Sequence, residues 1–507
     1  MNDGHERRKV LDLSRYREKD RALPGLPAGQ ERGAGKRAPG KKLPGILGER
    51  RWLLLALLLV AAIDLMPTPP GLSVAGKYAL GLWAFVVVCF LTEALPLPMT
   101  ALFIGSYQIF TGIGTFHEVP RTFMDDAVIF IMGVLMTGAM LIKYNIHNRV
   151  TLYMLRLSGP RIERIILGMV AFCAFGAAFI TEHAAVVIML PVGVGLVSLC
   201  GGYQKVPNLA RLLMLAISYG VIIGGVASPS GGARNALMIG LLNSLGLNVG
   251  YGQWVLMAAP FTLIMIPVVT YWLLSLYPPE ISDLSRAVGS IKKEMEAAGP
   301  MTGRARAMLA IFLAVLAGWV FLGHRFGVGN IAMAGVILAA VFRLVDWSYL
   351  QSKTQWGVVL LYAGAISMGR MLISTGAATW LAGQLLHLAA AAEMTEGLHL
   401  LAVTASITAL VTNTMADGPT VAVLGPVFLK VAELSHISPV ATGVATSLAA
   451  AFSFLLIIAT PANAIVYGPG FLRPVDFLKA GGVLFLLSLV LLIALLANLW
   501  WRAIGIW

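Results

Sequence analysis

The chain has 507 residues, of which 58% are hydrophobic and only 12% are charged. This composition excludes an ordinary soluble domain and is typical of a protein with many membrane-spanning helices. The three cysteines all lie in apolar segments, so we expect neither a disulfide framework nor a cysteine-rich metal site.

More than half of the formal net charge of +13 lies in residues 1–51, which hold 14 Lys and Arg against 7 Asp and Glu. This segment is rich in Gly and Pro and has no apolar period, which predicts a disordered basic tail. The first apolar run begins at Trp52, so we expect no cleavable signal peptide. Beside a first membrane helix, a basic tail indicates the cytoplasmic side and contact with anionic lipid rather than a nucleic-acid partner.

Apolar segments that can cross a bilayer recur along the rest of the chain, since a spanning helix needs about 20 residues. Two regions, 164–200 and 397–434, are long enough for helical hairpins that enter and leave on one side. The pattern predicts an all-α polytopic membrane protein. Eleven further segments predict crossings, near 52–67, 78–95, 98–112, 127–143, 206–245, 253–277, 306–323, 329–346, 357–376, 440–471 and 478–501.

Basic residues predict how the chain is oriented. The connections 143–164 and 277–306 each carry five Lys or Arg, whereas 67–77 and 112–126 carry few. Cytoplasmic loops hold the excess of positive charge. We therefore expect a plasma (inner) membrane protein with a cytoplasmic N-terminus and, after eleven crossings, an external C-terminus.

The sequence also contains an internal repeat. Segment 133–142 (GVLMTGAMLI) resembles segment 364–373 (GAISMGRMLI), and Thr181 and Thr412 are separated by the same offset as these two segments. Asn235 and Asn463 are separated by nearly the same offset. Five crossings separate the two similar helices, so the repeats have opposite orientation. Inverted repeats with interrupted helices are typical of alternating-access transporters.

The repeat divides the chain into domains. We expect a first repeat with its leading helix and hairpin at 52–280, a cytoplasmic linker at 281–305, and a second repeat at 306–507.

In the second repeat, polar residues interrupt apolar segments at two places. The first is the hairpin tip, where Thr408 and Thr412-Asn413-Thr414 precede Gly418 and Pro419; the second is Ala459-Thr460-Pro461-Ala462-Asn463. Broken backbone within a bilayer is tolerated only where it is buried or lines a cavity. Hydroxyl, amide and backbone oxygens without a carboxylate suit a cation such as Na⁺. The alternative is a polar kink that holds helices together.

In the first repeat, the corresponding places carry charge. The hairpin tip reads Thr181-Glu182-His183, and the interrupted segment 224–235 contains Gly231 and ends at Arg234-Asn235. Ionisable residues within a membrane are candidates for function. The alternative for Glu182 and Arg234 is a structural ion pair.

With these segments, the chain resembles the divalent anion–sodium symporter family of dicarboxylate, citrate and sulfate transporters. The resemblance covers about residues 78–501. It rests on segments 92–100 (TEALPLPMT), 356–364 (WGVVLLYAG), 412–414 (TNT) and 459–463 (ATPAN). It implies a homodimer formed through the early helices of each repeat and a hairpin-bearing domain that moves as an elevator.

The resemblance also implies binding sites. Each hairpin tip and its interrupted segment would bind Na⁺ and contact the substrate. The sodium site of the second repeat would comprise Thr408, Thr412, Asn413, Ala459 and Pro461. Together with the charged residues above, the expected substrate-binding set is Thr181, Glu182, His183, Arg234, Asn235, Asn413, Thr414, Thr460, Pro461 and Asn463.

The first sodium site, around Gly231, departs from the family pattern. Glu182 and His183 stand where the family has Asn and Thr, and Arg234 replaces a Pro. We expect Arg234 to take over the electrostatic role of the first sodium ion with Glu182 as its partner, while His183 could bring a proton into the cycle. The roles of Asp417 and of Arg370, which either snorkels or pairs with a carboxylate, stay open.

The expected function is secondary active transport of small organic anions, di- or tricarboxylates, coupled to sodium in the second repeat. The alternatives are a proton-coupled or sodium-independent exchanger, or a transporter of sulfate or another oxyanion. A membrane enzyme of the metalloprotease type is disfavoured because an HExxH motif is absent, and an ATP-driven pump is disfavoured because a GK[ST] motif is absent. A channel is disfavoured because paired broken hairpins suit an occluding site. No organic cofactor is expected.

Overall fold

The computed structural model describes residues 51–144, 157–285, 301–390 and 396–507, together with residues 146, 149, 153, 289 and 394. The regular elements within these ranges are all helical. The predicted tail, apart from Arg51, and most of the predicted linker 281–305 lie outside the described residues.

The helices of the first half follow the predicted segments. Polar side chains start two of them, because Ser73 accepts a hydrogen bond from the Gly76 amide and Asp125 accepts one from the Ala127 amide. The bounds are α3 (Arg51–Leu65), α4 (Val74–Thr92), α5 (Leu97–Phe110), α6 (Glu118–Phe123), α7 (Asp126–Lys143), α9 (Ile162–Ile180), α10 (Glu182–Leu199), α11 (Pro207–Gly224), α12 (Ala233–Ser244) and α13 (Tyr251–Leu276).

The second half has a similar series of long helices. One of them, α20, falls between predicted segments and was not expected from the sequence. The bounds are α15 (Gly303–Phe321), α16 (Gly323–Phe326), α17 (Val328–Val341), α18 (Trp347–Lys353), α19 (Trp356–Ser374), α20 (Ala377–Ala390), α21 (Gly397–Met415), α22 (Asp417–Leu434), α23 (Pro439–Ala449), η1 (Ile457–Ala459), α24 (Pro461–Tyr467), α25 (Pro474–Val490), η2 (Leu491–Trp500) and α26 (Trp501–Ala503).

Ten helices within the described part of the chain are long and apolar enough to cross a membrane. They include the hairpin arms α9, α10 and α21, whereas α3, α5 and α17 have only 14 or 15 residues. The protein is therefore an all-helical membrane protein, as predicted. The count of eleven crossings stays a prediction.

The two halves pack against each other through matching helices. Helix α7 packs on α17, and α19 packs on α5. At the first contact, a Cβ atom on Gly133 would collide with Ala332; at the second, a Cβ on Gly364 would lie 2.7 Å from the Ala101 Cα. Ala101 and Ala332 are separated by the same sequence offset as the two glycines. The same small-residue contact thus occurs twice at the predicted offset, which supports the repeat; the opposite orientation of the halves stays a prediction.

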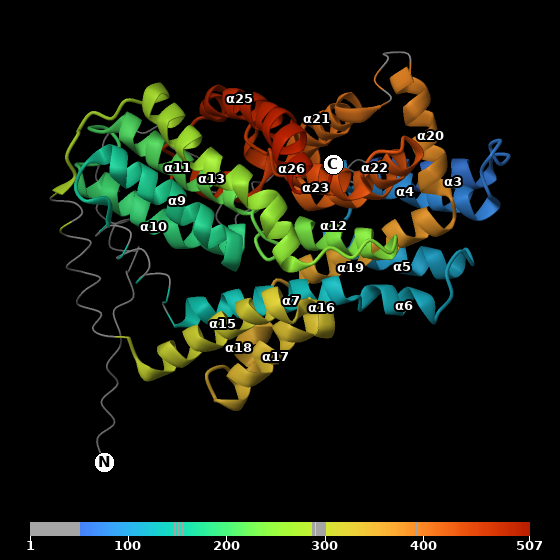
Figure 1. Cartoon of the computed structure of the whole chain (residues 1–507), viewed down its shortest axis with the longest axis horizontal. Helices are drawn as coiled ribbons and strands as arrows, with labels where there is room; N and C mark the ends of the chain where they lie inside the picture. Colours follow the sequence, from blue (N-terminus) through green and yellow to red (C-terminus); the bar gives the residue numbers. More distant parts are fainter. Residues whose placement is uncertain are drawn as a thin grey trace, which may run out of the picture. The chain divides into compact units, whose positions relative to one another are not determined.

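Each predicted hairpin consists of two antiparallel arms joined by a single residue. Thr181 joins α9 to α10 with φ of 104°, and Ala416 joins α21 to α22 with φ of 67°. Helices α9 and α10 both pack on α11 (Figure 1). Helix α22 packs on α12, α19 and α23. The first hairpin therefore lies against α11, which ends at Gly224, and the second lies against α12.

The turn of the second hairpin differs from the prediction. Thr412-Asn413-Thr414 was expected to form the tip, but α21 continues through these residues to Met415. Gly418 and Pro419 were expected to interrupt the helix, yet they belong to the first turn of α22. Proline is tolerated there because the first-turn amides have no partner within the helix. Ala416 makes the turn instead.

Candidate functional site

Both predicted interruptions are present. Helix α11 ends at Gly224 and α12 begins at Ala233, while α23 ends at Ala449 and α24 begins at Pro461. Only the single turn η1 interrupts the second gap. Each gap frees backbone amide and carbonyl groups inside an apolar region, where they need partners.

A buried asparagine spans each gap in the same way. The Asn235 side-chain amide donates to the carbonyl oxygens ten and seven residues earlier, at 2.8 and 2.7 Å. Asn463 donates to the carbonyl oxygens ten and seven residues earlier, at 2.8 and 2.9 Å. Each asparagine oxygen accepts from a serine of the other half: Ser447 donates to Asn235 at 2.8 Å and Ser218 donates to Asn463 at 2.6 Å.

Asn235 and Asn463 were both expected to bind substrate, and their hydrogen bonds bear on that expectation. Both asparagine side chains are fully buried, and both of their N–H donors are used within the chain. Their oxygens keep one acceptor position each. Asn235 and Asn463 therefore hold the two gaps in shape, and a contact with substrate stays a prediction.

The residues expected to bind sodium join the second hairpin to the second gap. Thr412 donates to the Ala450 carbonyl at 2.6 Å, and Asn413 donates to the Phe452 carbonyl at 3.0 Å. The Asn413 oxygen accepts from the Leu455 amide at 3.0 Å. Hydroxyl, amide and carbonyl oxygens thus lie together in a buried region, which is a donor set that suits a hard cation.

The other expected residues of the second half are placed less uniformly. Thr408 is buried but donates to the Thr404 carbonyl of its own helix, and Thr414 is exposed and donates to Val411. Ala459 and Thr460 are buried, whereas Pro461 is exposed. Among the described residues, no group of three or more His, Cys, Asp or Glu could hold a metal ion.

Arg234, at the start of α12, is the centre of the charged site. Its side chain is only 1% exposed. One terminal nitrogen, Nη2, donates to Glu182 Oε1 at 2.7 Å, and the other, Nη1, forms an ion pair with Asp417. The Glu182 partner was predicted from the sequence, but the second partner was not. One guanidinium therefore connects both hairpins.

The two acidic residues occupy equivalent positions. Glu182 is the first residue of α10 and Asp417 is the first residue of α22, each directly after the one-residue turn. Pro191 and Pro426, further along the same arms, are separated by the same number of residues as Glu182 and Asp417. The proline spacing is the sequence signal that could have identified Asp417 as the counterpart of Glu182.

Neighbouring residues shape the space around this ion-pair cluster. A side chain at Gly225 would collide with the Glu182 carboxyl group, and one at Gly418 would collide with the Tyr362 hydroxyl. Tyr362, on α19, is buried and was not expected at the site. His183 is half-buried, as expected for a residue beside the tip, and lies within electrostatic range of Asp417.

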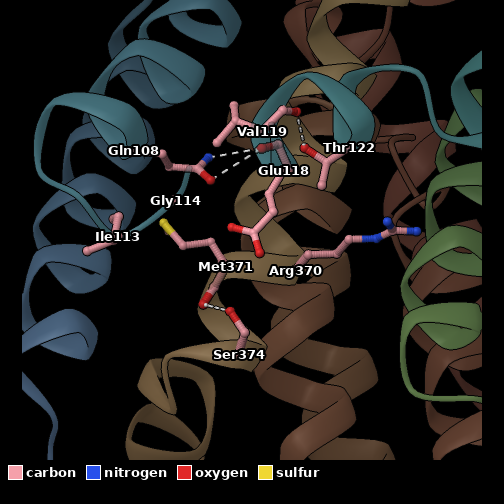
Figure 2. Close-up of a pocket in the computed structure, with 10 residues that line it drawn as sticks. Gln108, Ile113, Gly114, Glu118, Val119, Thr122, Arg370, Met371 and Ser374 are labelled. Carbon is pink, nitrogen blue, oxygen red and sulfur yellow. Dashed lines mark hydrogen bonds between the residues drawn. The ribbon is translucent and has the colours of Figure 1, made fainter. Parts of the chain in front are cut away.

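A second charged pair lies outside the cluster formed by Arg234, Glu182 and Asp417. Arg370 forms an ion pair with Asp125 at the start of α7, which resolves its role in favour of a carboxylate partner. Two cavities of about 380 and 270 Å³ adjoin Arg370. Figure 2 shows the smaller, with the Arg370 guanidinium directed away from Gln108. Neither cavity is lined by a residue of the expected substrate or sodium sites.

A profile described as the sodium:sulfate symporter transmembrane region matches residues 49–507. The chain belongs to the sodium:sulfate symporter family. The predicted resemblance is thereby confirmed, and the protein is an integral membrane protein of a transporter family. The match begins where the basic tail ends.

Relatives of this sodium:sulfate symporter family protein include two bacterial proteins. The sodium-dependent dicarboxylate transporter SdcS of Staphylococcus saprophyticus is 24% identical over 481 residues, covering 88% of this chain and 90% of the relative. A membrane protein of Cupriavidus necator is 25% identical over 474 residues, covering 89% and 91%.

Two solved structures share the fold. The YdaH transporter of Alcanivorax borkumensis has a TM-score of 0.53 at 15% identity, over 90% of this chain and 98% of that one. MtrF of Neisseria gonorrhoeae has a TM-score of 0.56 at 13% identity, over 89% and 94%. At these identities, the likeness concerns the helical fold alone.

Proposed function

We propose that this protein is a secondary active transporter of small organic anions, di- or tricarboxylates, coupled to Na⁺ at a site in the second half of the chain. The observation that carries the proposal is Arg234, a buried arginine held between the first residues of two hairpin arms. The name of SdcS, a sodium-dependent dicarboxylate transporter, supports the substrate class and the coupling ion.

The guanidinium of Arg234 suits an anionic substrate. Arginine stays charged and presents its N–H groups in a planar fork that matches a carboxylate or an oxyanion. Because Glu182 and Asp417 come from different hairpins, an anion that binds this fork changes how the two hairpins are linked through Arg234. Such a coupling gives substrate binding a way to change the state of the carrier.

The sodium proposal rests on the oxygens of the second hairpin and gap. Thr412 donates to the Ala450 carbonyl, and the adjacent Asn413 donates to the Phe452 carbonyl. No carboxylate belongs to this set, so a bound Na⁺ would bring a positive charge that an anionic substrate nearby can balance. Family resemblance further supports a homodimer, an elevator motion, and a cytoplasmic N-terminus.

A flux experiment tests the proposal. Purified protein in liposomes should take up labelled succinate, citrate or sulfate in a saturable manner under an inward Na⁺ gradient, and internal unlabelled substrate should accelerate the uptake. Liposomes without protein provide the control. Flux that rises linearly with concentration and shows no trans-stimulation would indicate a channel, and the absence of flux for all three anions would contradict the proposal.

Sodium-independent exchange or proton coupling is the second candidate. The observation that favours it is the ion-pair cluster of Arg234, Glu182 and Asp417, with His183 close by, at the place where the first sodium site was expected. A fixed arginine carries no ion down a gradient, so each Na⁺ replaced forfeits about 2.3 kcal/mol of drive per 100 mV if its charge crosses the full field. Uptake that ignores Na⁺ but requires internal anion or a pH gradient would select this candidate.

A further inference from the structure

Both terminal nitrogens of Arg234 already face acidic side chains of the protein. Glu182 accepts from Nη2 and Asp417 pairs with Nη1, which leaves one N–H on each terminal nitrogen, and the buried Nε has no hydrogen-bond partner. Because the Arg234 side chain is only 1% exposed, a third carboxylate at this fork would meet two like charges in a buried site. In this structure, the Glu182 and Asp417 side chains therefore occupy the positions next to Arg234 that a substrate carboxylate needs.

The two acidic residues are not equally easy to displace. The Glu182 side chain is 8% exposed and lies against Gly225, where there is no room for even one additional carbon atom. The Asp417 side chain is 21% exposed. It follows the turn at Ala416, and its second oxygen accepts a hydrogen bond from the Gly418 amide at 2.7 Å, so the carboxylate keeps a partner when it leaves the arginine.

We propose that Asp417 is a tethered substitute for the substrate's anionic group, which occupies Arg234 in the substrate-free protein and is displaced by a substrate carboxylate or sulfate oxygen. This inference rests on the proposed function and names Asp417 as a residue that sets affinity and specificity. Glu182 stays on Arg234 in both states and positions it.

Charge balance supports an exchange of this kind. With both carboxylates ionised, the guanidinium and its two partners carry a net charge of −1. Adding a further anion would place uncompensated negative charge in a buried site, which is strongly unfavourable. Replacement of Asp417 by one substrate carboxylate leaves the charge next to Arg234 unchanged, and the more exposed aspartate returns toward water.

The exchange also selects the ligand. The group that replaces Asp417 has to be a planar carboxylate or a tetrahedral oxyanion able to accept from Nη1. Neutral molecules and cations lack the acceptor charge to compete with an aspartate held within the same chain. Release of Asp417 also removes the ion pair between the second hairpin and α12, so the same step that binds substrate loosens the link of Arg234 to one hairpin and keeps its link to the other.

Equilibrium binding to the purified full-length protein tests the inference, with labelled succinate and labelled sulfate as probes. Asp417→Asn should bind at least one of the two about tenfold more tightly than the wild type, because the internal competitor is gone. Glu433→Gln is the matched control: Glu433 is an acidic residue of the same helix that pairs with Lys430 on the surface, and its affinity should equal that of the wild type.

A second measurement does not require a substrate. Phenylglyoxal modifies accessible guanidinium groups, and peptide mass spectrometry can follow the modification at Arg234. Asp417→Asn should raise the modification rate at Arg234 several-fold, whereas Glu433→Gln should leave it unchanged. If Asp417→Asn does not yield a monodisperse protein, Asp417→Ser serves as the second variant.

The outcomes separate the two proposals. Weaker or unchanged binding by Asp417→Asn, in a wild type that does bind succinate or sulfate, overturns the role of Asp417 as a competitor. An unchanged modification rate at Arg234 also overturns it. If no variant binds either anion while Arg234 becomes more reactive, the anion-transport proposal fails and the shielding by Asp417 stands.

Discussion

Arg234 and Asp417 form an ion pair across 183 residues of sequence, between the start of α12 and the turn of the second hairpin. With Glu182 as the third member, the cluster ties three separate elements to one guanidinium. Breaking a buried ion pair by removing one partner costs more than removing the whole set, because the remaining charges are left without compensation. Stability and function can therefore be tested separately at this cluster.

Arg234→Ala should abolish anion binding and lower the stability of the protein by about 3–5 kcal/mol, because two carboxylates lose their partner. The triple variant Glu182→Gln, Arg234→Met and Asp417→Asn should recover most of that stability but no transport. Thermal unfolding in detergent and liposome flux measure the two effects. Normal transport by Arg234→Ala would show that the arginine is purely structural, and would remove the basis of the proposed site.

Thr408→Val should weaken the response to sodium while the protein stays folded. The Thr408 hydroxyl donates only within its own helix, so its loss costs less than about 1.5 kcal/mol of stability. If the same oxygen contributes a similar free energy to Na⁺ binding, its loss raises the half-saturating Na⁺ concentration roughly tenfold.

Thr404→Val provides the control, since Thr404 is also buried and donates within the same helix, one turn earlier. Half-saturating Na⁺ should be unchanged in that variant. Equal shifts in both variants, or none in either, would argue against a sodium site at Thr408. Flux measured against Na⁺ concentration at fixed membrane potential decides between these results.

Asn235→Ala and Asn463→Ala should destabilise the protein to a similar degree. Each substitution removes the asparagine donor from two carbonyl groups. The Ser228 and Leu456 carbonyls keep a backbone amide as donor, whereas loss of the donor to the Gly225 or Ser453 carbonyl costs about 1–3 kcal/mol. Ser218→Ala and Ser447→Ala should have smaller and mutually similar effects, because each removes one hydrogen bond. Melting temperatures in detergent provide the comparison, and a large effect at only one asparagine would contradict the equivalence of the gaps.

Gly133→Ala and Gly364→Ala should each overpack a contact between the halves and cost about 1–3 kcal/mol, since the new methyl group meets Ala332 or Ala101. Gly383→Ala on α20 is the control, because a methyl group there meets nothing within 4 Å. It should be neutral or stabilise the helix by up to about 1 kcal/mol. If all three variants unfold at the same temperature, the close contacts do not contribute to stability.

Much of this arrangement could be predicted from the sequence, because apolar length and helix interruption are local signals. The positions of both gaps and of both hairpins, and the pairing of Glu182 with Arg234, agree with the structure. Helix α20 was missed because it has only 14 residues and interrupts its apolar pattern with Gln384 and His387. Its length falls short of a membrane span, so a search for spans passes over it.

The place of the second turn could not be predicted from the same signals. Matching Thr412 to Thr181 uses similar side chains, whereas the turn depends on which residue adopts a positive φ, and that residue is Ala416. The alignment of Thr181 with Thr412 and the alignment of Glu182 with Asp417 differ in offset by about one helical turn. The shift conceals the correspondence between Glu182 and Asp417, and Tyr362 could not be placed at the site because its helix lies far from both hairpins in the sequence.

Ser218 and Ser447 each donate a hydrogen bond to the asparagine of the other half, and this has a consequence for how the protein matures. Asn235 receives its last hydrogen bond from Ser447, which leaves the ribosome 212 residues later. The first gap therefore stays incompletely supported while most of the second half is still being synthesised. A chain truncated before Ser447 would carry a first half that is inserted but unfinished, with a loosely held gap that quality-control proteases of the membrane could recognise. Assembly of either gap is thus a late event that belongs to the whole chain.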